Sequence, residues 1–147
     1  MAGNRRRIKE GDIFAIPLDE QMVAVGIVLH VSKYFANAIL AGYFDRCFSS
    51  VEHIPVQDLA AQFVFTPNYT GKQLLTKDHW PVIGHRNDLI DQAIIPELVV
   101  VTDVFYKDEV LKRLPSLEAA KQYEPVEGQG KGYVENRLRR YFRSNKD

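Results

Sequence analysis

The sequence predicts an α+β domain in which β-strands dominate, as a strongly bent antiparallel sheet or an SH3-like partial barrel with short helices. Three observations predict this class. Apolar and polar positions alternate with period two within residues 11–45, glycines interrupt two of the strands predicted there, and an amphipathic helical pattern lies near the C-terminus. Long strands with internal glycines are the means by which small sheets curl.

Length and composition indicate one folded unit. The chain has 147 residues, a usual length for one domain, so a single domain is expected over residues 1–147. Hydrophobic residues make up 46% and charged residues 26%, which are ordinary values for a globular protein. Residues 1–10 are polar and are expected to be flexible.

The first strand is predicted over residues 11–18, where Phe14 and Ile16 alternate with Ile13 and Ala15. A short polar connection leads into the clearest element, residues 22–33. Apolar residues occupy every second position of this second strand and so share one face, namely Val23, Val25, Ile27, Leu29 and Val31. The opposite face is small and mixed, so partial cover is expected there.

Glycine inside the second strand predicts a bulge, a bend or a close backbone approach at Gly26. A third strand is predicted over residues 37–45. Farther along, the pattern predicts a short strand over 62–66, ended by a turn at 67–71, and one long strand over 98–106.

The last third of the chain is predicted to be helical. A short helix is expected over residues 107–114, and a second one capped by Ser116. Glycines at 128, 130 and 132 predict a flexible break over residues 128–132. The final helix has an apolar face formed by Val134, Leu138, Tyr141 and Phe142.

Charge weighs against a domain-wide nucleic-acid interface, because 19 basic and 19 acidic residues cancel. A local basic face on the last helix keeps a nucleic-acid-binding β-barrel module open as a hypothesis, and it consists of Arg137, Arg139, Arg140 and Arg143. The arginines at 5–7 precede no apolar segment, and Cys47 is the single cysteine. A cytoplasmic protein without membrane contact is therefore expected.

No convincing catalytic or metal site is predicted, and no cofactor. His79 and His85 lie six positions apart, which in an extended strand separates them by about 20 Å, too far for one metal ion. Cys47 lacks a cysteine-hydrolase signature and is expected to be inert and buried. One catalytic alternative stays open, a small esterase or phosphotriesterase. It would require a loop to bring together His79, His85, Asp88 and Asp103.

Two segments carry a family resemblance. Residues 11–18, GDIFAIPL, followed by VAVGIVL at residues 23–29, resemble the opening of the immunity protein 26 family, whose typical pattern is G-D-I-F-x-I-P-L and then Y-A-Y-G-x-V-L. Residues 80–85, WPVIGH, resemble the later W-x-[IV]-[IV]-G segment of that family. One departure is Val23, which stands where an aromatic residue is common.

The resemblance implies a bacterial antitoxin that binds one cognate toxin domain of a polymorphic toxin system. Some relatives are catalogued under a phosphotriesterase name, so the resemblance also leaves the hydrolase alternative open. Binding a toxin requires a rigid scaffold and an exposed patch with aromatic anchors and matched charge. The candidate contact residues are Tyr34, Tyr69, Asp78, Trp80 and Arg86, although Trp80 also fits a place in the core.

Overall fold

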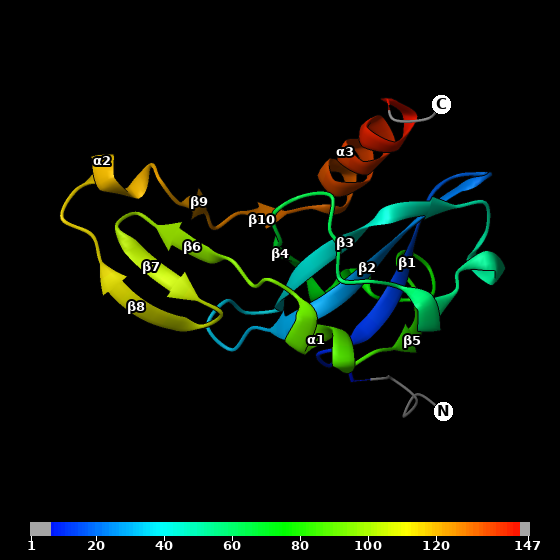
Figure 1. Cartoon of the computed structure of the whole chain (residues 1–147), viewed down its shortest axis with the longest axis horizontal. Coiled ribbons are helices and arrows are strands. Elements are labelled where there is room, and N and C mark those ends of the chain that lie inside the picture. Colours follow the sequence, from blue (N-terminus) through cyan, green and yellow to red (C-terminus); the bar gives the residue numbers. More distant parts are fainter. Residues whose placement is uncertain (1–6, 145–147) are drawn as a thin grey trace.

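The structure is a computed structural model that describes residues 7–144 (Figure 1). Within this part of the chain, ten strands form two separate sheets that lie end to end along the longest axis of the molecule. The predicted class, α+β with strands dominant, is confirmed. The flexibility predicted for residues 1–10 concerns mainly residues 1–6, which lie outside the described residues.

The larger sheet has six strands in the order β10-β4-β3-β2-β1-β5. These are β1 (Asp12–Asp19), β2 (Met22–Val31), β3 (Ala38–Phe48), β4 (Asn68–Gly71), β5 (Val82–His85) and β10 (Gly128–Gln129). Neighbours are antiparallel except β10, which runs parallel to β4. The meander of β1, β2 and β3 was predicted. The sheet is open, with β10 and β5 at its edges, so a bent sheet describes it and a closed barrel does not.

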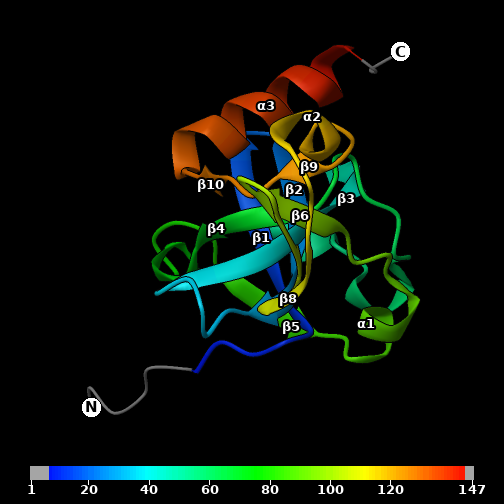
Figure 2. The same ribbon diagram turned by 90° about the vertical axis from the view of Figure 1, so that its left-hand side faces the viewer.

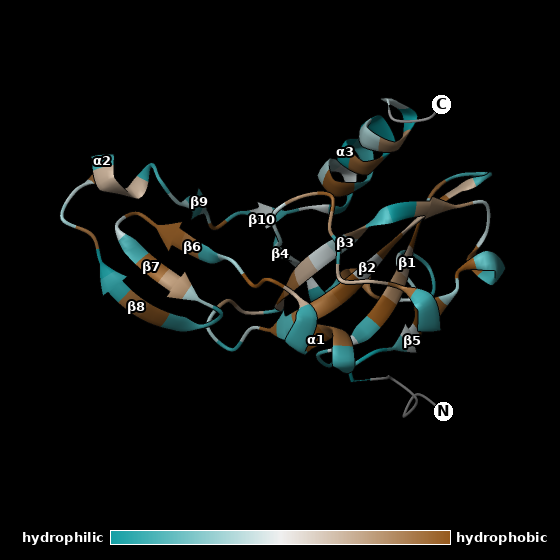
Figure 3. Cartoon of the chain, viewed as in Figure 1, coloured by the Kyte–Doolittle hydropathy of each residue, from teal (hydrophilic) through white to brown (hydrophobic). Residues whose placement is uncertain are grey.

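Both faces of the three central strands are buried, whereas the sequence predicted full burial for one face of β2 only. Figure 3 shows hydrophobic residues in these strands. One face, which includes Ile13, Val25 and Leu40, packs under residues 51–63 and helix α1 (Asp88–Gln92). The segment from Val51 contains two short 3₁₀ turns, Val51–His53 and Val56–Asp58, and a third lies at Lys72–Leu74.

The second face of the sheet packs against Trp80 and helix α3 (Lys131–Ser144), which crosses it in Figures 1 and 2. Val134 and Leu138 of α3 are buried there, as the apolar face of the predicted helix requires. Trp80 is fully buried, and its indole Nε1 donates a hydrogen bond of 2.9 Å to the Glu135 carboxylate. Lys131 Nζ lies 3.0 Å from the same carboxylate, so the buried charge is paired.

The predicted face is wrong at one position of β2. Val28 pairs with Ala41 and His30 pairs with Leu40, so β2 contains one extra residue between them. A bulge of this kind turns the following side chains to the opposite face. Val31 therefore packs with Phe14 and Trp80, and not with Val25 and Leu29.

The close backbone approach predicted at Gly26 is confirmed. A Cβ atom at this position would lie 2.5 Å from Cζ of Phe14 and 3.2 Å from the carbonyl oxygen of Gly42. The Phe14 ring stacks on Trp80, with centroids 5.8 Å apart and an interplanar angle of 8°. Glycine at 26 is thus what allows two aromatic side chains to lie flat against the sheet.

The smaller sheet has four strands in the order β8-β7-β6-β9, namely β6 (Glu97–Val100), β7 (Asp103–Tyr106), β8 (Glu109–Arg113) and β9 (Glu124–Pro125). Two predictions are wrong here. The single strand predicted over 98–106 is a hairpin, because Val101 adopts a left-handed φ of 58° and reverses the chain. The helix predicted over 107–114 is strand β8, entered through Lys107 with φ of 57°.

Three further boundaries differ from the prediction. Residues 62–66 form only an isolated bridge, Phe63 to Phe44, and the turn predicted over 67–71 is strand β4. The segment 128–132, predicted to be a flexible break, contains strand β10 and the start of α3.

The helix predicted after Ser116 is present as α2 (Leu117–Ala120), and the Ser116 hydroxyl accepts the amide N–H of Ala119 as predicted for a cap.

One continuous segment joins the two sheets, since β9 pairs with β6 and β10 pairs with β4. The buried side chain of Asn68 holds this segment in place. Its Nδ2 donates to the carbonyl of Pro125 at 2.9 Å, and its Oδ1 accepts the amide N–H of Glu127 at 2.9 Å. A residue predicted to lie in a turn therefore fixes the relative position of the sheets.

We expect Gly26→Ala to destabilise the fold by about 1–3 kcal/mol, because the Phe14 ring cannot move away from a new methyl group while it stacks on Trp80. Urea unfolding measures this change. Gly132→Ala in the first turn of α3 is the matched control, since a Cβ there meets nothing within 4 Å. Equal unfolding midpoints for Gly26→Ala and the wild type would contradict the expectation.

Candidate interaction surface

The smaller sheet projects from the body of the molecule and carries much of its exposed apolar surface (Figure 1). Eight large apolar side chains are exposed within the described residues, and six of them belong to the smaller sheet or its adjoining segments. These six are Tyr34, Val101, Tyr106, Val110, Leu111 and Leu117. Clustering of exposed apolar side chains marks an interaction site more often than their number does.

The two faces of the smaller sheet differ. Helix α2 covers one face, where Val99 and Val104 pack against Ala120. On the other face, Phe105 pairs with Val110 across β7 and β8, and the Tyr34 ring packs edge-on against Phe105 with centroids 5.2 Å apart. We call this second face, formed by Tyr34, Asp103, Phe105, Val110 and Arg113, the second-sheet face.

The second-sheet face has apolar anchors and a charged margin. Tyr34 is 61% exposed and Val110 is 50% exposed. Beside them, Nε of Arg113 donates to the Asp103 carboxylate at 2.8 Å. This hydrogen bond and the charge of Arg113 lower the pKa of Asp103 against the smaller opposing effect of burial. The arrangement matches protein interfaces, in which aromatic anchors lie inside a polar rim.

Strand β8 is an edge strand, and all five of its residues are exposed. A register shift leaves Leu111 as an extra residue between the pairs Val104–Lys112 and Phe105–Val110. Bulges and lysines are features by which native edges resist pairing with another strand. The second-sheet face is therefore suited to binding through its side chains.

A carboxylate in the β7–β8 turn fastens the smaller sheet to the larger one. Asp108 accepts hydrogen bonds from His30 Nε2 at 2.9 Å, the Ser32 hydroxyl at 2.7 Å and the Lys33 amide N–H at 2.7 Å. Burial raises the pKa of Asp108, but these three donors outweigh burial and hold it below its ordinary value. The other ring nitrogen of His30, Nδ1, lies 3.0 Å from the Glu10 carboxylate.

Aromatic rings fill the junction beneath this carboxylate. Phe35 packs on Tyr69 and on Phe105, with centroids 4.9 and 5.9 Å apart. The Tyr69 hydroxyl donates to the carbonyl of Lys107 at 2.9 Å. Burial, aided by the charge of Asp108, raises the pKa of Tyr69 to about 12, so this phenol stays neutral. The turn that positions Tyr34 is thus held from both sheets.

The structure separates the predicted contact residues by exposure. Tyr34 is exposed and lies on the second-sheet face, whereas Tyr69 is 3% exposed and Trp80 is fully buried. Tyr69 closes the junction and Trp80 holds α3, so neither offers a surface to a partner in this structure. The alternative that placed Trp80 in the core is confirmed.

The two charged candidates lie elsewhere. Asp78 is exposed in the loop before β5. The Arg86 side chain is 13% exposed, and its guanidinium donates to the carbonyl of Val56 at 2.8 Å and to Asp88 at 2.7 Å. Arg86 therefore holds a loop over the core. Contact of Arg86 with a partner stays a prediction, and its low exposure weighs against it.

Three of the four residues of the hydrolase alternative pair with residues outside the set. His85 Nδ1 lies 3.0 Å from the fully buried Asp12 carboxylate. Asp88 pairs with Arg86, and Asp103 pairs with Arg113 in the smaller sheet. His79 is exposed in the loop before Trp80. Within residues 7–144, no three His, Cys, Asp or Glu side chains gather as a metal site requires.

Cys47 is exposed, so the prediction of a buried thiol is wrong. The residue lies in β3 opposite Ala24, beyond the point where β3 loses its regular register with β2. The imidazole of nearby His53 accepts hydrogen bonds from the hydroxyls of Ser49 and Ser50, at 3.0 and 2.8 Å, in the tautomer that leaves Nδ1 unprotonated.

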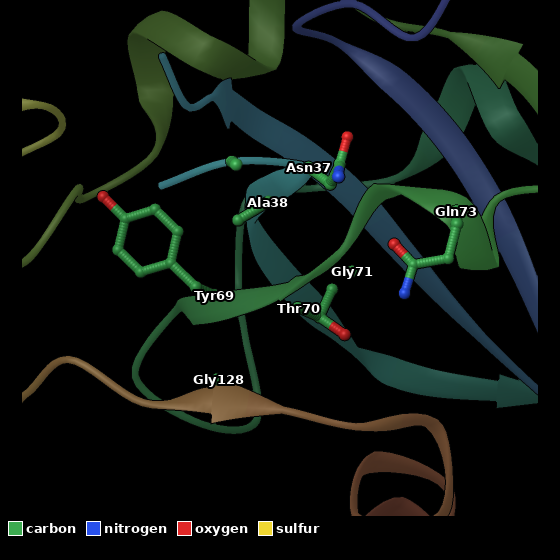
Figure 4. A pocket seen from close by; sticks show the side chains of 8 residues that line it. Asn37, Ala38, Tyr69, Thr70, Gly71, Gln73 and Gly128 are labelled. Atoms are coloured by element: carbon green, nitrogen blue, oxygen red, sulfur yellow. The ribbon is translucent and has the colours of Figure 1, made fainter. Parts of the chain in front are cut away.

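A groove of about 510 Å³ lies at the end of the larger sheet, between the turn before β3, strand β4 and strand β10 (Figure 4). Its polar side chains are Asn37, Tyr69, Thr70 and Gln73, and the Thr70 hydroxyl already donates to the carbonyl of Gln129. Among residues 7–144, no carboxylate, imidazole or thiol lines this groove.

Comparison with protein families decides the classification. The family model described as Immunity protein 26 matches residues 9–110, more than two thirds of the chain. The chain belongs to the immunity protein 26 family. Searches of curated proteins and of solved structures gave no match. None of the helices within the described residues is long and apolar enough to cross a membrane.

The family match ends inside β8, yet the structure continues without a break. Residues 111–144 supply the end of β8, both strands that link the sheets, and α3. The hydrogen bond from Trp80 to Glu135 joins a residue of the matched segment to one outside it. In this immunity protein 26 family member, the unmatched third is part of the same packed unit.

Tyr34 was predicted from the sequence as a candidate contact residue, whereas Val110 and Asp108 were not. Both fall within the helix that was predicted over residues 107–114. Lys107 and Asp108 separate apolar positions, but the pair is not a typical hairpin dipeptide such as Asn-Gly or Asp-Gly. The local sequence therefore contains only a weak signal for β7 and β8.

We expect Asp108→Asn to loosen the smaller sheet and to cost about 1–3 kcal/mol, because one carboxylate oxygen becomes an N–H donor facing other donors. Hydrogen exchange should accelerate in β6, β7 and β8 and stay unchanged in β1 and β2. Asp103→Asn, at an exposed ion pair, is the matched control. Uniform acceleration across both sheets would count against a local fastening.

The same carboxylate predicts a dependence on pH. Since the folded-state pKa of Asp108 is lowered, its stabilisation is complete above its unfolded-state pKa of about 4 and is lost as the pH falls through the folded-state value. The stability difference between wild type and Asp108→Asn should therefore shrink below about pH 4. A difference that grows on acidification would contradict this assignment.

Proposed function

We propose that this chain is an immunity protein that binds a cognate bacterial toxin domain and neutralises it by protein–protein contact, using the second-sheet face. Membership of the immunity protein 26 family carries the proposal. The exposed Tyr34 and Val110 beside the Asp103–Arg113 pair support the location.

The physical basis is the fixed geometry of the anchors. Tyr34 lies on a short turn whose neighbours Ser32 and Lys33 both donate to Asp108. Its ring is also held against Phe35 and Phe105. An anchor that is ordered before binding loses little conformational entropy when a partner covers it. A rigid tyrosine of this kind is a typical hot spot of protein interfaces.

Protection of growth tests the function. The toxin domain encoded next to this chain's gene is expressed alone and together with this chain in the same host, and the two purified proteins are mixed for size-exclusion chromatography. We expect co-expression to restore growth and the mixture to elute as one complex. Full toxicity in the presence of this chain, with no complex, would reject the proposed function.

Variants test the location. We expect Tyr34→Ala and Val110→Asp to weaken toxin binding by about 1–4 kcal/mol each, the range of hot-spot truncations, as measured by isothermal titration calorimetry. Leu117→Ala is the matched control, because Leu117 is 65% exposed on α2, the helix that covers the opposite face. Unchanged affinity in both variants, with growth protection retained, would keep the function and move the contact elsewhere.

A further inference from the structure

A second feature, on helix α3, is independent of the second-sheet face. The guanidinium of Arg137 lies over the Phe65 ring, 3.8 Å from its centroid, and 5.7 Å from the centroid of Tyr133. The Tyr141 ring also packs edge-on against Phe65, with centroids 6.0 Å apart. We call Phe65, Tyr133 and Arg137 the arginine platform.

Arg137 differs from three other cations of the helix, each of which forms an ion pair with a carboxylate. Arg143 and Arg139 both pair with Asp19, and Lys131 pairs with Glu135. Within residues 7–144, no carboxylate forms an ion pair with Arg137. Burial raises the pKa of Tyr43, the phenol whose ionisation Arg137 favours, so that phenol is neutral and supplies no counter-charge.

Stacking fixes the direction of the guanidinium donors. A guanidinium that lies over an aromatic ring keeps its N–H groups in the plane, where they can grip a carboxylate with two hydrogen bonds. The partial burial of Arg137 strengthens such a contact over one made in open water. The exposed Arg140, three residues along the helix, adds positive charge nearby.

Two grooves adjoin the platform, and one of them is apolar. The apolar groove, of about 570 Å³, is lined by residues 61–67 together with Ile94 and Pro96, and Ile94 is 85% exposed. The other, of about 460 Å³, is lined by residues 127–130 and Tyr133, and its longer side chains apart from Tyr133 are the polar Glu127 and Gln129. Phe65 belongs to the first groove and Tyr133 to the second.

We propose that the arginine platform is a docking site for a protein segment that carries an acidic residue next to an aliphatic one. The carboxylate binds Arg137, and the aliphatic side chain occupies the apolar groove at residues 61–67. Charge complementarity selects this occupant, because a stacked arginine without a paired carboxylate, beside an apolar groove, matches a carboxylate beside an apolar side chain. The proposal does not depend on toxin binding at the second-sheet face.

Fluorescence anisotropy with defined peptides tests the proposal on the full chain. The probe is fluorescein-labelled Gly-Ile-Asp-Ile-Glu-Ile, and its matched control replaces Asp with Asn and Glu with Gln. We expect the acidic probe to bind and the amide probe to bind at least about tenfold more weakly. Arg137→Gln should remove this preference, and Arg137→Lys should lose part of it, because lysine keeps the charge without the planar donors.

Three control measurements separate this site from general electrostatics and from the proposed function. Arg143→Gln removes another cation of α3, and Tyr34→Ala alters the second-sheet face; both should leave probe affinity unchanged. Equal loss in Arg143→Gln and Arg137→Gln, or equal affinity for both probes, would overturn the proposal. Absence of binding at about 1 mM probe would also overturn it, as would stronger competition by a single-stranded oligonucleotide than by unlabelled acidic peptide.

Discussion

The fold depends on one constraint, that β1, β2 and β3 are apolar on both faces. A sheet of this kind cannot leave either face in water, so two layers must be recruited from elsewhere in the chain. Residues 51–63 with α1 supply one layer, and Trp80 with α3 supply the other. The need to cover the second face explains why the C-terminal helix is packed into the unit although the family match ends at residue 110.

The smaller sheet stands outside this requirement. Its own small core joins Val99, Val104 and Ala120, and it meets the larger sheet at a junction of aromatic rings and one carboxylate. Helix α2 covers only the opposite face, and on the second-sheet face Tyr34 and Val110 stay exposed to a partner although Phe105 is buried beneath Tyr34 and Phe35. The hydrogen bonds that Asp108 accepts, together with the hydrogen bond from Asn68 to Pro125, give the smaller sheet a defined position. A binding surface held in this way combines exposure with rigidity.

Sequence patterns predicted the elements in which one physical signal dominates. The alternation in β1–β3 and the helical spacing of Val134 and Leu138 reflect burial directly, and both were predicted. The hairpin of β6 and β7 was missed because its turn residues, Val101 and Thr102, are both β-branched and typical of strands. Val101 also has a left-handed conformation that such residues rarely adopt. Tertiary pairing overrides local preference at that position.

The candidate site was predicted only in part for the same reason. Tyr34 was identifiable as an aromatic residue in a polar turn, but its value as an anchor comes from Phe105 and Asp108, about 70 positions away. Trp80 and Tyr69 are aromatic residues of equal appearance in the sequence, and the structure buries both. Exposure of a single aromatic side chain depends on long-range packing, which periodicity does not report.

Hydrogen exchange of the purified chain with and without its bound toxin domain tests the central claim most directly. If the chain acts through the second-sheet face, amides of residues 33–35 and 103–113 exchange more slowly in the complex, while those of the β1–β2 turn at Glu20 and Gln21 keep their rates. Protection confined to the β1–β2 turn or to the loop before β5, with β7 and β8 unchanged, would contradict this account.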